Sequence, residues 1–165
     1  MFELKPISKP AVPAALRKAE RYRLLNEPLE AESICRDVLE VEPDNQEALV
    51  TLVLALSDQL GEKSDVHAEA KRRVAALADP YARSYYGGIL CERQAKAALR
   101  RGGPGSGRVA YQWLHEAMER FAEAIDLCPP GNDDAVLRWN TCVRLLGSAR
   151  GIEPPLEEPV EQMLE

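Results

Sequence analysis

The sequence predicts an all-α fold of antiparallel helix pairs, and two observations favour it. Hydrophobic residues make up 45% of the 165-residue chain but aromatic residues only 5%, a composition that suits many small helix–helix contacts. Three alanines, Ala31, Ala68 and Ala117, each precede a proline by twelve residues. A small residue lets neighbouring helices approach closely, and a proline without an N–H ends a helix. The spacing therefore predicts three helix-turn-helix repeats.

The most informative motif lies in the stretch AYQWLHEAMERFAEAIDLCPP. It places Ala117, Phe121, Ala124 and Pro129 at the spacing A-x3-F-x2-A-x4-P. This pattern resembles the second helix of a tetratricopeptide repeat. The resemblance spans most of the chain and is specific in this helix and in the first repeat. It implies a right-handed superhelix of antiparallel helix pairs, with about three and a half repeats and a terminal capping helix.

The first repeat is expected from about Pro13 to Asn45. Its opening helix contains Leu16 and Ala19, and Pro28 stands near the start of its second helix, where proline sacrifices no needed hydrogen bond. The second helix carries apolar residues at i, i+3, i+4 and i+7 spacing. The segment EPDN closes this repeat.

The second repeat opens at Gln46 and is the least regular. Counting back from Pro80 places Ala68 at the small position, but it places Arg72 where the family usually has an aromatic residue. We therefore expect a register slip in this helix. A better apolar face is formed by Val66, Ala70, Val74 and Leu77.

The third repeat, from Tyr81, is longer than the family norm by about seventeen residues. Gly88 stands at its small position, and close approach of a neighbouring helix would offset the cost of a helical glycine, about 1 kcal/mol. Apolar stripes continue on both sides of GGPGSG, which cannot stay helical. A long helical hairpin at about 92–116 is therefore expected to project from the array.

A last helix, from about Asp133 to Leu146, is expected to cover the end of the array and brings the total to seven helices. The predicted organisation is an N-terminal extension at 1–12, a helical domain at 13–149 and an acidic tail at 150–165. The tail holds five glutamates and is expected to be mobile, or else to occupy a groove of the helical domain. Without those five, 22 acidic residues face 21 basic ones, so the near-neutral body does not favour nucleic-acid binding.

Cysteine usage and hydropathy indicate the environment of the chain. The four cysteines are widely separated at apolar helix positions, and we interpret them as reduced, buried thiols of a cytoplasmic protein. The chain has no CxxC pair, so a zinc site is not expected. No signal peptide and no membrane-spanning segment are expected either.

The motifs that come nearest to catalytic patterns are incomplete. His115-Glu116 begins like a zincin motif, but the second histidine is replaced by Glu119. The segment GGPGSGR has the glycines of a phosphate-binding loop without its Gly-Lys-Ser/Thr ending. We therefore expect no catalytic residues, no cofactor and no metal, and we interpret the protein as a non-enzyme.

The family resemblance also implies a binding face, because the first helices of tetratricopeptide repeats line a concave groove. A carboxylate clamp of the family is rejected, since the matching positions offer no lysine or asparagine, and an apolar peptide or helix is the expected ligand. The tyrosines of the third repeat could contact that ligand or only pack the helices. Carried over by position, the face comprises Leu16, Glu20, Arg23, Val50, Leu54, Asp58, Tyr85, Ile89 and Arg93.

Two functions remain open at this point. The first is an adaptor or scaffold that binds a segment of a partner protein in this groove. The second is a self-assembling structural protein, in which the long hairpin and the terminal helix bury against another copy. The surroundings of Trp113 and Trp139 should discriminate, because a large exposed apolar surface would favour assembly and an open groove would favour a ligand.

Overall fold

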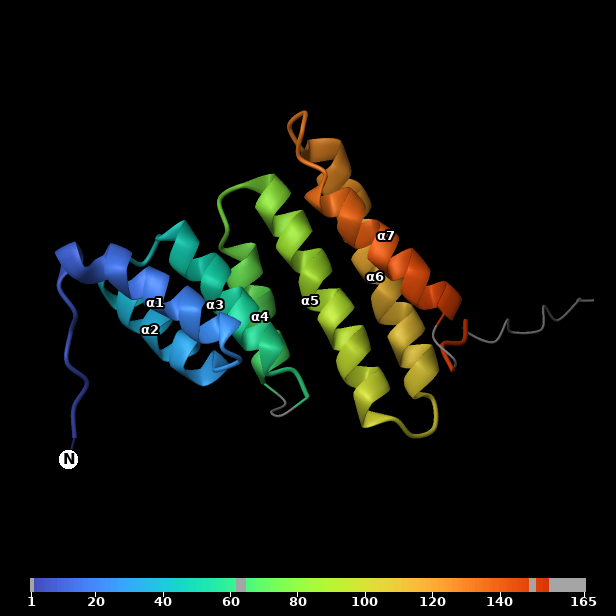
Figure 1. The fold of residues 1–165 in the computed structure, drawn as a ribbon, viewed down its shortest axis with the longest axis horizontal. Coiled ribbons are helices and arrows are strands. Elements are labelled where there is room, and N and C mark those ends of the chain that lie inside the picture. Colours follow the sequence, from blue (N-terminus) through green and yellow to red (C-terminus); the bar gives the residue numbers. More distant parts are fainter. Residues whose placement is uncertain (1, 62–64, 149–150, 155–165) are drawn as a thin grey trace, which may run out of the picture.

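Figure 1 shows the computed structural model, in which residues 2–61, 65–148 and 151–154 are described. Seven α-helices and one short 3-10 helix make up the secondary structure of these residues, with no β-strand among them. The predicted all-α class and helix number are therefore confirmed. The elements are η1 (Lys9–Ala11), α1 (Val12–Leu24), α2 (Pro28–Val41), α3 (Gln46–Asp58), α4 (Val66–Ala75), α5 (Pro80–Arg101), α6 (Ser106–Leu127) and α7 (Asp134–Ser148).

The α-helices follow one another through space in chain order, from α1 at one end to α7 at the other (Figure 1). Each helix packs against the next one along the chain. The odd-numbered helices form a second series of contacts, in which α3 touches α1 and α5, and α5 also touches α7. The long helices α5 and α6 share the most extensive contact in the molecule.

Local sequence signals explain where several helices begin. Proline stands in the first turn of α1, α2 and α5, where no N–H is needed. The side chain of Asn45 accepts a hydrogen bond from the Ala48 N–H at 2.9 Å and caps α3. Asp79 accepts one from the Tyr81 N–H at 3.0 Å and caps α5. Between α1 and α2 the chain turns at Asn26, whose φ is +60°.

The register of α4 differs from a simple count back from Pro80. Ala68 is exposed on α4, whereas Ala70 is completely buried. Val66 and Leu77 are also buried. The small contact position of α4 is therefore two residues further along the chain, which is the kind of slip that the apolar stripe indicated.

The two long helices pack closely at a glycine. Ala117, Phe121 and Ala124 of α6 are all completely buried. A Cβ atom added at Gly88 of α5 would lie 2.5 Å from the ring of Phe121. The aromatic residue of the motif thus occupies the space that a side chain at Gly88 would fill, and this contact offsets the low helix propensity of glycine.

The outer half of the α5–α6 hairpin packs against neighbouring helices along its length and does not project freely as expected. Ala95, Ala98 and Ala110 are buried in one cluster with residues of α7. Ala97 belongs instead to a cluster with residues of α1 to α4, which includes Leu60. The hairpin predicted at 92–116 therefore contributes side chains to both clusters. Only its turn, at residues 102–105, lacks helical structure.

After α7, Ile152 packs against the cluster formed by α5, α6 and α7. The carbonyl oxygen of Gly151 lies against Gly107 of α6 and leaves no room for a Cβ atom there. The rest of the predicted acidic tail, apart from Glu153 and Pro154, lies outside the described residues. None of the helices in the described part of the chain is both long and apolar enough to cross a membrane.

Candidate functional site

The face predicted from the family resemblance comes from α1, α3 and α5, three residues from each helix. Leu16 and Ile89 are buried in the core, and Glu20 is exposed. The residues that remain partly accessible and apolar are Val50, Leu54 and Tyr85. The apolar floor of this face is thus shared between accessible and core positions.

Three of the four charged residues of the predicted face meet at one carboxylate. Asp58 of α3 pairs with Arg23 of α1 at 3.0 Å and with Arg93 of α5. Arg93 also donates to the hydroxyl of Ser57 and, at 3.1 Å, to the carbonyl oxygen of Leu54. Burial lowers the pKa of Arg93, and Asp58 opposes that shift. These partners hold both guanidinium groups against α3.

A second ion-pair group continues this series to α7. Glu92 of α5 is completely buried and pairs with Lys96 and, at 3.4 Å, with Arg138. Burial acts to lower the pKa of Arg138, but the nearby Glu92 and Tyr85 outweigh it and raise the pKa overall. Ion pairs therefore join α1 to α3, α3 to α5 and α5 to α7. Most of the charge on this face is already matched within the protein.

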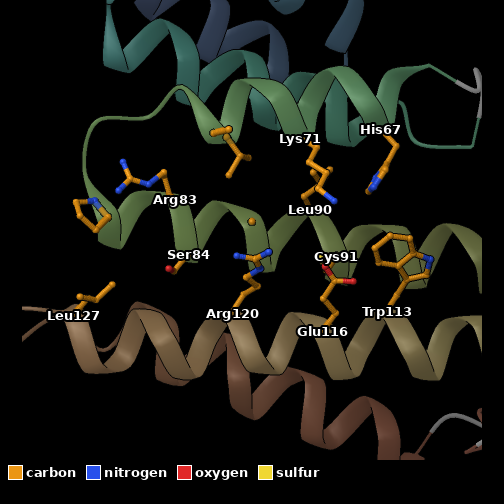
Figure 2. A pocket seen from close by; sticks show the side chains of 14 residues that line it. His67, Lys71, Arg83, Ser84, Leu90, Cys91, Trp113, Glu116, Arg120 and Leu127 are labelled. Atoms are coloured by element: carbon orange, nitrogen blue, oxygen red, sulfur yellow. The ribbon is translucent and has the colours of Figure 1, made fainter.

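A different surface is hollowed. A groove with a volume of about 330 Å³ lies between α4 and α6, with α5 as its floor (Figure 2). His67 and Trp113 stand at one end of it, and Arg83 and Leu127 stand at the other. The lining residues are His67, Lys71, Val74 and Ala75 of α4; Pro80, Arg83, Ser84, Gly87, Leu90 and Cys91 of α5; and Trp113, Glu116, Arg120 and Leu127 of α6.

The short α4 and a glycine in the floor explain why this groove is open. Helix α4 has only 10 residues, whereas α6 has 22. On its other side α4 is tied to α2, because Arg36 donates to both carboxylate oxygens of Glu69 at 2.9 Å. Gly87 adds no side chain to the floor, and a Cβ atom there would only touch Val74 and Arg120 at 3.7 and 3.8 Å. The space above Gly87 therefore stays accessible.

The groove combines apolar and cationic side chains. The rings of His67 and Trp113 meet edge to face, with centroids 5.0 Å apart. Burial lowers the pKa of His67, nearby Lys71 adds to the shift, and Glu116 opposes it. Arg83 donates to the carbonyl oxygens of Leu77 and Ala78 at 2.7 and 3.0 Å, which fixes it beside the groove.

The groove does not offer an activated cysteine. Cys91 is buried in its floor, and burial, followed by the nearby charge of Glu116, raises the pKa of its thiol to about 12. A thiol with this pKa stays protonated at neutral pH and reacts poorly. His115 and Glu119 form an exposed pair at 3.3 Å on the outer side of α6. Within the described ranges, no three His, Cys, Asp or Glu side chains are grouped so that they could hold a metal ion.

Reasoning from the sequence missed this groove because it took the family's first helices as the binding face. One signal could have indicated it. Of the paired glycines Gly87 and Gly88, only Gly88 is required by packing against Phe121. Gly87 has no such contact and lies in the floor of the groove.

Comparison of the chain with protein-family models, with curated proteins and with solved structures found no match. The resemblance to tetratricopeptide repeats therefore stays a prediction that rests on the motif and on its spacing.

Proposed function

We propose that this protein is a non-catalytic adaptor or scaffold, whose groove between α4 and α6 holds a segment of a partner protein. The observation that carries the proposal is the groove itself, about 330 Å³ between two helices. Its mixture of apolar lining and a few polar groups is typical of sites that bind a ligand. A partner helix or extended segment would lie along α4 and α6, as in other helix-in-groove recognition.

We further propose that the helix pairs form the right-handed superhelix of a tetratricopeptide array, in a protein of the cytoplasm. The chain-order packing of the helices and the contacts among the odd-numbered helices support this arrangement. Buried free thiols at Cys35, Cys91 and Cys142 support the location, because reducing compartments keep thiols unpaired. In this array the groove lies between second helices of adjacent repeats, not on the face of first helices.

The matched charges on the α1–α3–α5 face support this choice of surface. A ligand there would have to compete with the Asp58 carboxylate for Arg23 and Arg93. Displacing an established ion pair costs the energy of that pair before any new contact forms. In the groove between α4 and α6, Lys71 pairs with no described carboxylate, and Arg120 forms only a long pair with the exposed Glu123 at 3.8 Å.

A peptide selection tests the proposal. Random peptides displayed on phage are selected against the whole protein and then compared on two variants. Gly87→Leu extends a side chain between Val74 and Arg120 into the groove, whereas Gly147→Leu is a matched change on α7, where a Cβ atom meets nothing within 4 Å. We expect selected peptides to bind the wild-type protein and Gly147→Leu but not Gly87→Leu. Peptides that bind all three proteins equally, or a selection without specific binders, would contradict the proposal.

A further inference from the structure

The charge of the groove is opposite to that of the whole chain. The formal net charge of the protein is −6, yet Lys71, Arg83 and Arg120 line the groove against the single carboxylate of Glu116. Clefts that concentrate one sign of charge between low-dielectric walls attract ligands of the other sign. The groove thus favours negatively charged ligands, although the net charge of the chain is negative.

Two of these cations are available to pair with a carboxylate of a ligand. Lys71 makes no ion pair with a described residue, and the nearest carboxylate partner of Arg120 is the exposed Glu123 at 3.8 Å. Figure 2 shows Lys71 and Arg120 reaching from α4 and α6 over the floor formed by α5. Arg83 is different, because two backbone carbonyl groups already hold its guanidinium. Lys71 on the α4 side and Arg120 on the α6 side are therefore the cations that a ligand in the groove can contact.

An apolar surface lies beside these two cations. Leu90, which is 3% exposed, belongs to the floor. The partly exposed Trp113 belongs to the α6 wall, where the His67 ring closes the end of the groove. A ligand that uses the whole groove needs an apolar side chain for this end and carboxylates further along. Glu116 stands near the apolar end and would repel a carboxylate placed there.

We infer that the groove recognises an acidic amphipathic segment of another protein, with a large apolar side chain against Trp113 and Leu90 and carboxylates on Lys71 and Arg120. This inference rests on the proposed function and adds the chemistry of the partner. Lys71 and Arg120 are then the specificity-determining residues. Because each contributes a charge at the edge of an open groove, each should affect selectivity more than folding.

The test uses short fluorescent peptides and fluorescence anisotropy. The first probe alternates leucine and phenylalanine with glutamate, and two matched probes carry glutamine or lysine in place of glutamate. We expect the glutamate probe to bind at least about fivefold more tightly than the glutamine probe and to lose affinity when salt is added. The lysine probe should not bind. Equal affinities for the glutamate and glutamine probes would overturn the inference.

Variants test whether Lys71 and Arg120 cause the preference for the glutamate probe. Lys71→Gln and Arg120→Gln should each lower the affinity for the glutamate probe about threefold or more and leave the glutamine probe unchanged. Arg144→Gln, an exposed change on α7, is the control and should alter neither. If the selected phage peptides bind the groove but carry no acidic residues, the partner chemistry is wrong while the proposed function stands.

The chain's own segment 155–165 carries the same chemistry, with four glutamates among apolar residues. Truncation after Pro154 distinguishes the two sources. Unchanged affinity for the glutamate probe supports a partner segment as the occupant. A large gain in affinity on truncation would show that the chain's own segment occupies the groove, and would overturn the assignment to another protein.

Discussion

At the scale of single residues, two adjacent glycines of α5 have opposite structural roles. Gly88 lies under the ring of Phe121, and Gly87 lies in the floor of the groove. The same substitution should therefore have opposite effects at the two positions. This difference can be measured without a ligand.

We expect Gly88→Ala to destabilise the protein by about 1–3 kcal/mol, because the buried Phe121 ring must move away from the new methyl group. Gly87→Ala should be neutral or stabilising by up to about 1 kcal/mol, because its Cβ atom finds ordinary contacts and alanine favours a helix. Thermal unfolding of both variants followed by circular dichroism is the measurement. Equal melting temperatures would contradict the described contact between α5 and α6.

His67 gives a prediction about pH. Its pKa is lowered in the folded protein, chiefly because burial disfavours the charged ring. The unfolded chain then binds the proton more readily than the folded protein. The free energy of unfolding therefore keeps its full value above pH 6.5, the ordinary pKa of histidine, and falls as the pH drops through the folded-state pKa. His67→Asn should remove this loss between about pH 6.5 and pH 5, where carboxylates hardly titrate. If urea unfolding of His67→Asn shows the same pH profile as that of the wild-type protein, the prediction is wrong.

At the scale of elements, the register of α4 can be tested with two alanines. Ala70 is completely buried and Ala68 is exposed. We expect Ala70→Leu to cost about 1–3 kcal/mol because it overfills a helix contact, and Ala68→Leu to change stability by less than about 0.5 kcal/mol. Chemical denaturation of both variants checks this. The reverse order of stabilities would show that α4 has the register counted back from Pro80.

The helices were predictable because their signals are local. Proline in a first turn, the Asn45 and Asp79 caps and the apolar stripes each act within a few residues. The buried position of Ala117 and Phe121 also followed from the motif. The Arg23–Asp58–Arg93 contact did not, because it joins three helices, and spacing along one helix carries no information about such contacts.

The groove was not predictable either, because it too depends on how separate helices are placed together. It depends on the difference in length between α4 and α6, and on which side of α4 is tied to α2 by the pair of Arg36 and Glu69. These features become visible only when the helices are placed together. The sequence indicated the residues near the groove, such as Trp113 and the glycine pair, without the surface that they form.

At the scale of the whole molecule, we expect ligand binding rather than self-assembly from the surface near the two tryptophans. Trp139 is partly buried against the cluster of α5 and α6, and Trp113 lines the groove. The exposed Leu137 and Val143 of α7 are six residues apart and so do not share one helix face. We therefore expect a monomer in light scattering at micromolar concentration. A stable dimer that is lost when α7 is altered would favour the self-assembling alternative.

The central claim is that a partner segment lies between α4 and α6 rather than on the face of α1, α3 and α5. Site-specific photo-crosslinking tests this most directly, with benzoylphenylalanine introduced at exposed Ala75 of the groove in one variant and at exposed Glu20 of the other face in a second. A peptide obtained by phage selection is irradiated with each variant, and the products are separated by mass. We predict a crosslinked product from position 75 and none from position 20. A product from position 20 alone would contradict the account and place the ligand on the face of first helices.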